Sequence, residues 1–183
     1  MNVNDYYNRL LSKRSNINEH LPLIREYASL CNHVTEFGFG TGRSAAAILM
    51  SQPRTFVSYD IKQPRNLKKA KEMSKSLKVE FVFHRVSTLD CDIESTDMLF
   101  IDSLHTYNQL YNELLLHSDK VGTYIIMHDT ETFGDKDEHA KKSDGKMGLR
   151  KAISDFLKER PWQIVEHKTN NNGLTIMKRI SPG

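Results

Sequence analysis

The sequence has few of the features that mark disulfide-stabilised, zinc-binding or membrane-bound proteins. Its 183 residues include only two cysteines, Cys31 and Cys91, with no Cys-x-x-Cys or Cys-x-x-His spacing. This excludes a disulfide framework and the common zinc motifs. The chain also lacks an apolar run long enough to span a bilayer, and its amino-terminal stretch lacks the apolar core of a signal peptide. We therefore expect a cytoplasmic protein with no membrane partner.

An excess of charge of one sign is also missing. The 26 basic and 23 acidic residues leave a formal net charge of +3, and the lysines and arginines do not gather in one basic stripe. Proteins that bind nucleic acid usually show such a stripe, so we expect no nucleic-acid partner. With 38% hydrophobic and 27% charged residues, the chain has the composition of one globular domain covering residues 1–183. The sequence does not indicate an oligomeric state.

Strand-like and helix-like segments alternate along the chain. We expect strands at His33–Phe37, Thr55–Asp60, Val79–Val86, Met98–Asp102, Val121–His128, Trp162–Glu166 and Leu174–Lys178. We expect helices at Asn18–Leu30, Arg43–Ser51, Arg65–Leu77, Tyr107–Ser118 and Met147–Arg160. This alternation predicts a Rossmann-like α/β fold, with a doubly wound, mostly parallel, seven-stranded sheet and helices on both faces. The turn signal Asn170-Asn-Asn-Gly173 makes the last two strands an antiparallel pair.

Two segments lie outside this regular pattern. Residues 1–31 form an amino-terminal helical segment, in which Asn18 is a candidate N-cap and Leu23, Tyr27 and Leu30 share one helix face. Residues 130–146 have no periodicity and contain five acids, four lysines and two glycines directly after a strand. We interpret this second segment as a mobile lid over a binding site, or else as an inert loop.

The stretch VTEFGFGTGRS, residues 34–44, places Gly38, Gly40 and Gly42 directly behind an apolar strand. Such glycines allow a tight strand-to-helix turn and the close approach of a ligand to the backbone. A nicotinamide-binding loop would need a third glycine where Arg43 stands, and the chain has no Tyr-x-x-x-Lys pair. The loop also lacks the lysine of a phosphate-binding P-loop. A dehydrogenase or a P-loop nucleotidase is therefore disfavoured.

With Glu36 in front of it, the sequence EFGFGTG resembles motif I of the class I S-adenosylmethionine-dependent methyltransferases. Further matches follow in order. The strand FVSYD ends in Asp60, 20 residues after Gly40, where a carboxylate suits both ribose hydroxyls, and DMLFID ends in Asp102. In the second half, FIDSLHTY, IIMHDT and GLRKAI are similar to the small-molecule methyltransferases of methyltransferase family 24, relatives of the cephalosporin hydroxylase-like and macrocin O-methyltransferase groups. The resemblance covers about residues 16–178.

This resemblance implies S-adenosylmethionine as the cofactor and a donor pocket at the carboxyl ends of the strands. Ser87 and Thr88 would lie near the adenine ring, unless they are ordinary turn residues, and Ile61 would pack on that ring, unless it belongs to the core. The implied donor-binding residues are Glu36, Gly38, Phe39, Gly40, Gly42, Asp60, Ile61, Ser87, Thr88 and Asp102.

The candidate catalytic residues follow the fourth and fifth strands. His105, or else His128, could remove a proton from the acceptor, and the alternative for His105 is to cap the following helix. By resemblance to metal-dependent O-methyltransferases, Asp102 and Asp129 could hold Mg²⁺ or Mn²⁺, with His128 as a further ligand. Alternatively, Asp102 faces the methionine part of the donor and Asp129 caps the next loop. Because only two oxygen ligands can be named, the sequence slightly favours the absence of a tightly bound ion.

The function implied by these residues is methyl transfer to a hydroxyl of a small molecule, such as a sugar or a secondary metabolite. A methyltransferase that acts on bases would instead carry an [DNS]-P-P-[YF] motif after the fourth strand, where this chain has IDSLH. The alternative function is a methyltransferase-like module that binds S-adenosylmethionine or a nucleoside without transferring the methyl group.

Overall fold

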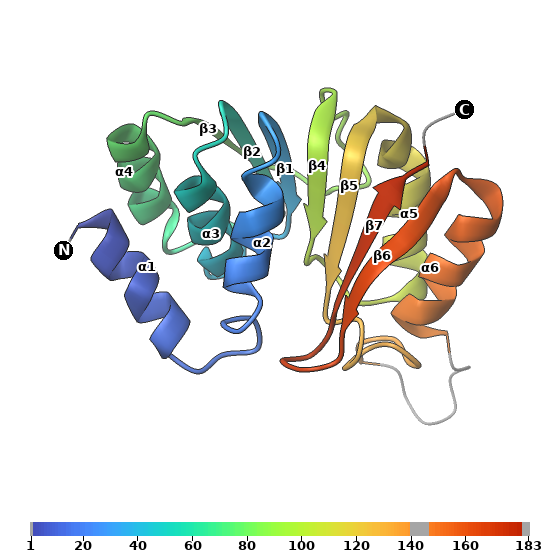
Figure 1. The fold of residues 1–183 in the computed structure, drawn as a ribbon. Helices are drawn as coiled ribbons and strands as arrows, with labels where there is room; N and C mark the ends of the chain where they lie inside the picture. The colour runs from blue at the N-terminus through green and yellow to red at the C-terminus, as the bar shows by residue number, and fades with distance from the viewer. Residues whose placement is uncertain (1, 140–146, 181–183) are drawn as a thin grey trace.

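The computed structural model describes residues 2–139 and 147–180, which form one seven-stranded sheet with the strand order β3-β2-β1-β4-β5-β7-β6 (Figure 1). The strands are β1 (His33–Phe37), β2 (Thr55–Asp60), β3 (Glu80–Arg85), β4 (Thr96–Ile101), β5 (Val121–His128), β6 (Trp162–Lys168) and β7 (Leu174–Arg179). The first five are parallel to one another, whereas β7 runs antiparallel to both β5 and β6. The predicted doubly wound sheet with its antiparallel end is confirmed.

Helices cover both faces of the sheet. The helices are α1 (Val3–Ser12), α2 (Leu21–Ala28), α3 (Arg43–Ser51), α4 (Leu67–Leu77), α5 (Tyr107–His117), the short 3₁₀ helix η1 (Ser118–Lys120) and α6 (Gly148–Glu159). Helices α1 to α4 pack into a core on one face, and α5 and α6 pack into a second core on the other. Among the residues that the structure describes, no helix is both long enough and apolar enough to cross a bilayer.

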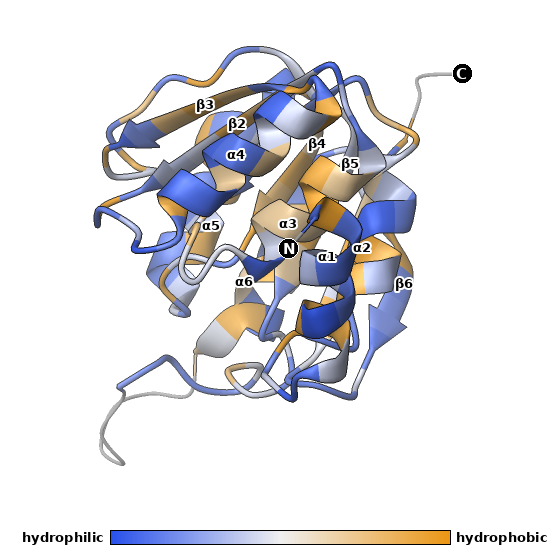
Figure 2. Cartoon of the chain, turned by 90° about the vertical axis from the view of Figure 1, so that its left-hand side faces the viewer, coloured by the Kyte–Doolittle hydropathy of each residue, from blue (hydrophilic) through white to orange (hydrophobic). Residues whose placement is uncertain are grey.

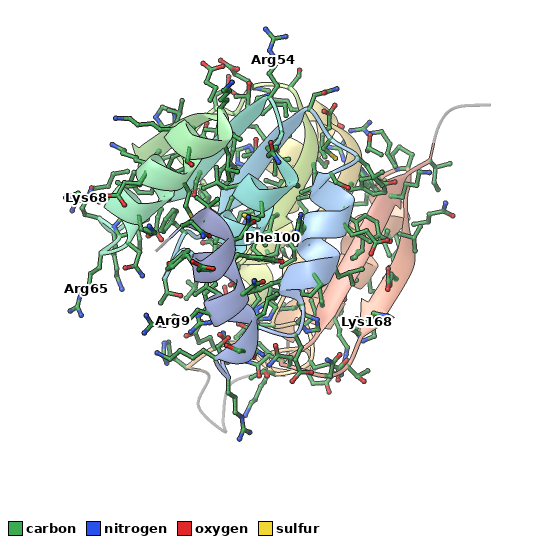
Figure 3. All side chains as sticks on the ribbon, turned by 60° about the vertical axis from the view of Figure 1, so that its left-hand side comes forward. Arg9, Arg54, Arg65, Lys68, Phe100 and Lys168 are labelled. Carbon is green, nitrogen blue, oxygen red and sulfur yellow. The ribbon has the colours of Figure 1, made fainter. Side chains whose placement is uncertain are left out.

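The pattern of side chains explains this layering. In α3, all residues from Ser44 to Met50 are buried, and only the two terminal residues of the helix are not. The helix is mostly apolar in Figure 2, where α4 shows a largely hydrophilic outer surface. Phe100 of the central strand β4 is completely buried and lies in the interior of the molecule (Figure 3). The labelled lysines and arginines in the same view point outward from different parts of the surface. The positive charge is therefore scattered.

The second helix begins later than predicted. Helix α2 starts at Leu21, because the Asn18 side chain is used elsewhere: its Oδ1 accepts from the backbone N–H of Ser15, and its Nδ2 donates to the carbonyl of Leu11. The prediction that Asn18 is the N-cap is therefore wrong. Leu30 lies beyond the end of the helix and is 67% exposed, so it does not share a buried face with Leu23 and Tyr27.

The strand order places the site. The chain leaves β1 toward β2 on one side and returns through β4 on the other side, so the order reverses between β1 and β4. In open α/β sheets, ligands bind in the crevice outside the carboxyl ends of the strands at such a reversal. The two loops that follow β1 and β4 are joined there, because the N–H of Asp102 donates to the carbonyl of Phe37 at 2.8 Å.

Candidate functional site

The glycine loop after β1 is shaped by close backbone approach on one side and open space on the other. Gly38 has φ +87°, and a Cβ there would lie 2.0 Å from the carbonyl oxygen of Asp102. Only glycine fits this position. Gly40 has φ +50°, and a Cβ there would meet no atom within 4 Å. Gly42 is also left-handed at the start of α3, against the buried ring of Phe39. The loop therefore rests on β4 and leaves Gly40 facing open space.

Asp60, at the end of β2, lies beside this loop. Its Oδ2 accepts a hydrogen bond from the N–H of Gly40 at 3.0 Å, and its Oδ1 accepts from the N–H of Lys62 at 2.8 Å. The structure thus brings the glycine loop together with Asp60, which follows Gly40 by 20 residues in the sequence. The neighbouring Ile61 is 63% exposed, so the alternative that it belongs to the core is wrong.

Glu36 is completely buried beneath the loop. The hydroxyl of Ser44 on α3 donates to Oε1 at 2.6 Å, and that of Ser58 on β2 donates to Oε2 at 2.5 Å. Burial raises the pKa of Glu36 to about 7, although both hydroxyl donors act in the opposite direction. Its carboxyl group therefore joins β1, α3 and β2 from inside, and its part in donor binding stays a prediction.

The hydroxyl groups after β3 both bond within the protein. The buried hydroxyl of Thr88 donates to Glu113 on α5 at 2.5 Å, and Glu113 also accepts from Ser103 at 2.7 Å. The Ser87 hydroxyl accepts from the N–H of Leu89, as an ordinary turn residue does. A contact of either residue with adenine stays a prediction. Glu113 gave no signal in the sequence, because its buried position depends on how α5 packs.

Three carboxylates surround the imidazole of His105. Its Nε2 lies 3.1 Å from Asp102 Oδ1 and 3.0 Å from Asp129 Oδ2, while its Nδ1 lies 2.8 Å from Glu138 Oε2. The ring stacks on Phe133 with the centroids 4.8 Å apart. The structure thus confirms that the segments after β4 and β5 meet, as the sequence indicated.

His128, the last residue of β5, lies on the other side of the same two aspartates. Its Nδ1 is 3.4 Å from Asp102 Oδ1 and 3.5 Å from Asp129 Oδ2, and its Nε2 is 3.1 Å from the carbonyl oxygen of Asn16. Both rings thus use both of their nitrogens. His20 lies edge-on to His128 with the ring centroids 5.7 Å apart.

The imidazoles and the aspartates of this cluster each stabilise the charged form of the other. Burial lowers the pKa of each imidazole, but the hydrogen bonds to Asp102 and Asp129 outweigh it and raise the pKa of His105 to about 10 and that of His128 to about 9. The two imidazoles in turn outweigh burial and hold the pKa of both aspartates below its usual range. These shifts favour the charged form of both imidazoles at neutral pH, with His105 between carboxylates and His128 between the two aspartates and the carbonyl oxygen of Asn16.

Asn172 was missed by the sequence reasoning, although it completes this cluster. Its side-chain Nδ2 donates to Asp129 Oδ1 at 2.7 Å, from the turn between β6 and β7. Asp129 itself has φ +61°, in the left-handed region. The sequence showed the Asn-rich stretch only as a hairpin signal. A side chain more than 40 residues away gave no sign that it would reach Asp129.

The structure decides one alternative for the candidate residues and shows which of them could share a metal ion. The N-cap of α5 is Thr106, whose hydroxyl accepts from the N–H of Gln109, so His105 does not cap that helix. Asp102, His128 and Asp129 each offer a ligand atom, and these atoms lie within 4.8 Å of one another. Two carboxylates and an imidazole fit a divalent ion, and the nitrogen ligand suits Mn²⁺, Fe²⁺ or Zn²⁺ better than Mg²⁺.

The segment predicted as a lid begins at this cluster. The N–H of Phe133 donates to the carbonyl of Asp129, and Asp137 Oδ1 accepts from the N–H groups of Tyr107 and Gly148. Residues 130–139 are thus tied to α5, α6 and the site, whereas residues 140–146 lie outside the described residues. Movement of this segment stays a prediction.

Comparison with solved structures identifies the fold. The chain resembles the O-methyltransferase TomG of Streptomyces achromogenes, in complex with SAM (TM-score 0.64, 15% identity, 92% of this chain and 82% of that one). It also resembles an O-methyltransferase of Bacillus cereus in complex with SAH (0.66, 13%, 92% and 83%) and the N-methyltransferase NodS of Bradyrhizobium japonicum (0.61, 12%, 91% and 97%). Neither a scan against protein-family models nor a search of curated proteins gives a match. The chain has the fold of the class I methyltransferases.

Proposed function

We propose that this chain is an S-adenosylmethionine-dependent methyltransferase that methylates a hydroxyl group of a small molecule in the cytoplasm. One observation carries the proposal: an open glycine loop with Asp60 beside it and a cluster of two aspartates and two histidines lie at the carboxyl ends of adjacent strands of a methyltransferase fold. The structural neighbours include O-methyltransferases crystallised with SAM or SAH. They support the assignment through the fold they share with this chain.

The donor would lie across the loop after β1. Gly40 leaves space for it, and Asp60 can accept hydrogen bonds from two ribose hydroxyls once the donor displaces its contacts with backbone N–H groups. Asp102 lies where the loops after β1 and β4 are joined. Among the described residues, no hydrogen bond uses its second oxygen, Oδ2, which could accept from the ammonium group of the donor.

The reaction needs little covalent chemistry from the protein. The acceptor oxygen attacks the methyl carbon, the carbon–sulfur bond breaks with its electron pair going to sulfur, S-adenosylhomocysteine leaves, and the hydroxyl proton passes to water. The protein aligns the two reactants and lowers the cost of the charge that develops on the acceptor oxygen. The imidazolium of His105 lies beside Asp102 and Asp129. It could stabilise negative charge on an acceptor oxygen that is held next to these residues.

A divalent ion would fit the same cluster. Asp102, His128 and Asp129 would hold it, and the ion would act as a Lewis acid that lowers the pKa of the acceptor hydroxyl. His105 makes hydrogen bonds to the same two carboxylates, so an ion and the His105 ring would compete for them. We include the ion in the proposal, because His128 adds the third ligand that the two aspartates alone do not provide.

One observation favours a second candidate, a module that binds S-adenosylmethionine without transferring its methyl group. Both nitrogens of His105 and both nitrogens of His128 already have partners within the protein. As an imidazolium, neither ring can accept a proton from a substrate until it has first given up one of its own. A cluster that only holds the loops in place would look the same.

An assay of methyl transfer separates these candidates. The purified protein is incubated with S-adenosylmethionine and a panel of hydroxylated small molecules, and the release of S-adenosylhomocysteine is followed by mass spectrometry. We expect turnover that is lost in excess chelator and restored by Mn²⁺ or Mg²⁺. Asp129→Asn should lower turnover by about 100-fold with little change in donor affinity, because the ion acts on the acceptor. The exposed Asp92 provides the control, Asp92→Asn.

Each outcome points to one mechanism. Full activity in excess chelator would show that the reaction needs no ion, and the His105 imidazolium would then be the stabilising group. Donor binding without transfer to any acceptor would favour the binding module.

A further inference from the structure

A polar cleft lies between two segments that are far apart in the sequence. One is the loop between α1 and α2, and the other is the turn between β6 and β7; the two segments come together at the lower edge of the molecule in Figure 1. The cleft has a volume of about 500 Å³, within the range of small-molecule sites. Its described lining residues are Arg14, Ser15, Asn16, Glu19, Asn171 and Asn172.

Several hydrogen bonds hold the two walls of the cleft together. Asn171 is bonded at both ends of its side chain: Nδ2 donates to the carbonyl of Ser15 at 2.7 Å, and Oδ1 accepts from the N–H of Glu19 at 3.0 Å. Asn170 Nδ2 donates to the Glu19 carboxylate at 2.6 Å, and His20 Nε2 lies 3.0 Å from the Asn170 carbonyl oxygen. The shape of the cleft is therefore fixed by bonds between the walls.

Both walls also contact the catalytic cluster directly. From the hairpin side, Asn172 Nδ2 donates to Asp129 at 2.7 Å. From the amino-terminal side, the carbonyl oxygen of Asn16 lies 3.1 Å from His128 Nε2. A molecule in the cleft would therefore touch Asn172 and Asn16, which in turn contact Asp129 and His128. The cleft is thus in position to hold the part of a methyl acceptor that extends outward from the cluster.

The chemistry of the lining residues selects the ligand. The six side chains are a guanidinium, a carboxylate, three amides and a hydroxyl, and none of them is aromatic or aliphatic. The opposite charges of Arg14 and Glu19 cancel. Groups that donate stand beside groups that accept, which suits hydroxyls, because each hydroxyl does both. A flat aromatic acceptor would cover these groups without bonding to them, at a cost for each one left unpaired.

We propose that this cleft is the acceptor subsite and that it takes an uncharged, polyhydroxylated molecule such as a sugar or a cyclitol. The inference rests on the proposed function, because it names the substrate class for the same site. Arg14 is the residue best placed to bind such a molecule. Its side chain is exposed, and within residues 2–139 and 147–180 it makes no hydrogen bond or ion pair.

Nuclear magnetic resonance titration tests the cleft without requiring turnover. Methyl α-D-glucopyranoside and, separately, catechol are added to the ¹⁵N-labelled full chain, and the signals of residues 14–19 and 170–173 are followed. We expect the glucoside to shift these signals and catechol to leave them unchanged. Arg14→Leu should weaken glucoside binding about tenfold, because it removes hydrogen bonds to a charged group. Lys13→Leu removes a neighbouring exposed charge that does not line the cleft, so it should bind the glucoside as the wild type does.

The contrary results are equally specific. The proposal is overturned if the glucoside shifts none of these signals, if catechol shifts them as strongly, or if Arg14→Leu and Lys13→Leu bind the glucoside alike. Calorimetry with S-adenosylmethionine on the same samples separates this failure from that of the proposed function. If the protein binds the donor but not the glucoside, only the acceptor-subsite proposal fails. If it binds the glucoside but not the donor, the proposed methyltransferase function fails.

Discussion

The carboxyl group of Glu36 makes a testable link between burial and stability. Burial raises its pKa in the folded protein to about 7, from an ordinary value of 4.5. A raised carboxyl pKa means that the folded state binds the proton more tightly than the unfolded state does. Its contribution to the free energy of unfolding is therefore fully present below pH 4.5 and falls as the pH rises toward 7. Above pH 7 the loss is constant, at about 3 kcal/mol.

The variant Glu36→Gln isolates this effect, because it keeps the shape of the side chain and can still bond to Ser44 and Ser58. Urea unfolding of both proteins is measured between about pH 4.5 and pH 8. We expect the stability of the variant relative to the wild type to increase by about 3 kcal/mol across this range. All other titrating groups cancel in the difference. Two parallel curves would show that Glu36 ionises in the folded protein as easily as in the unfolded chain.

Single residues also show what sequence can and cannot predict about the site. Asp60, Asp102 and Asp129 were predicted because each stands at the carboxyl end of a strand, where position along the chain determines position in the fold. Glu138 and Asn172 were not, because they reach the cluster from a loop and from a distant hairpin. Their contribution depends on how these segments pack back onto the sheet, and no local pattern encodes that.

Among the secondary-structure elements, the β6–β7 hairpin contacts the site through its turn. Gly173 in its turn has φ +92°, and a Cβ there would lie 2.4 Å from the backbone nitrogen of Glu131. Gly173→Ala must therefore shift either the turn or the segment that follows Asp129. We expect it to lower the free energy of unfolding by about 1–3 kcal/mol and the melting temperature by several degrees.

Differential scanning calorimetry checks this prediction against Gly122→Ala. Gly122 has no positive φ, and the nearest atom to an added Cβ is 3.6 Å away, so this substitution should have little effect. If Gly173→Ala melted at the wild-type temperature, the turn would have to adjust freely, and the walls of the cleft would not be fixed as described.

The predictability of the elements follows from their burial. The boundaries of β1, β2, β5 and α3 were predicted correctly, because buried apolar runs between turn residues leave little choice. Helix α2 was predicted three residues too early, because Asn18 resembles an N-cap in sequence but instead bonds within the preceding loop. Local propensity could not reveal this contact with Leu11.

At the scale of the whole molecule, the strand order brings the two halves of the site together. The donor loop belongs to β1 and β2, the cluster belongs to β4 and β5, and the reversal between β1 and β4 makes them neighbours. The alternation of strands and helices was enough to predict this architecture. It was not enough to predict the acceptor, because the cleft is built from two connecting segments whose pairing spans the chain.

The central claim is that the loop after β1 and Asp60 together bind S-adenosylmethionine, and isothermal titration calorimetry tests it most directly. We predict that the donor binds to the wild type in the micromolar range, about −7 to −8 kcal/mol. Asp60→Ala should weaken binding by about 1.5–3 kcal/mol, because charge-assisted bonds to the ribose are lost. Asp92→Ala, at an exposed carboxylate, should bind as the wild type does. No measurable binding to the wild type, or unchanged affinity in a folded Asp60→Ala protein, would contradict the account.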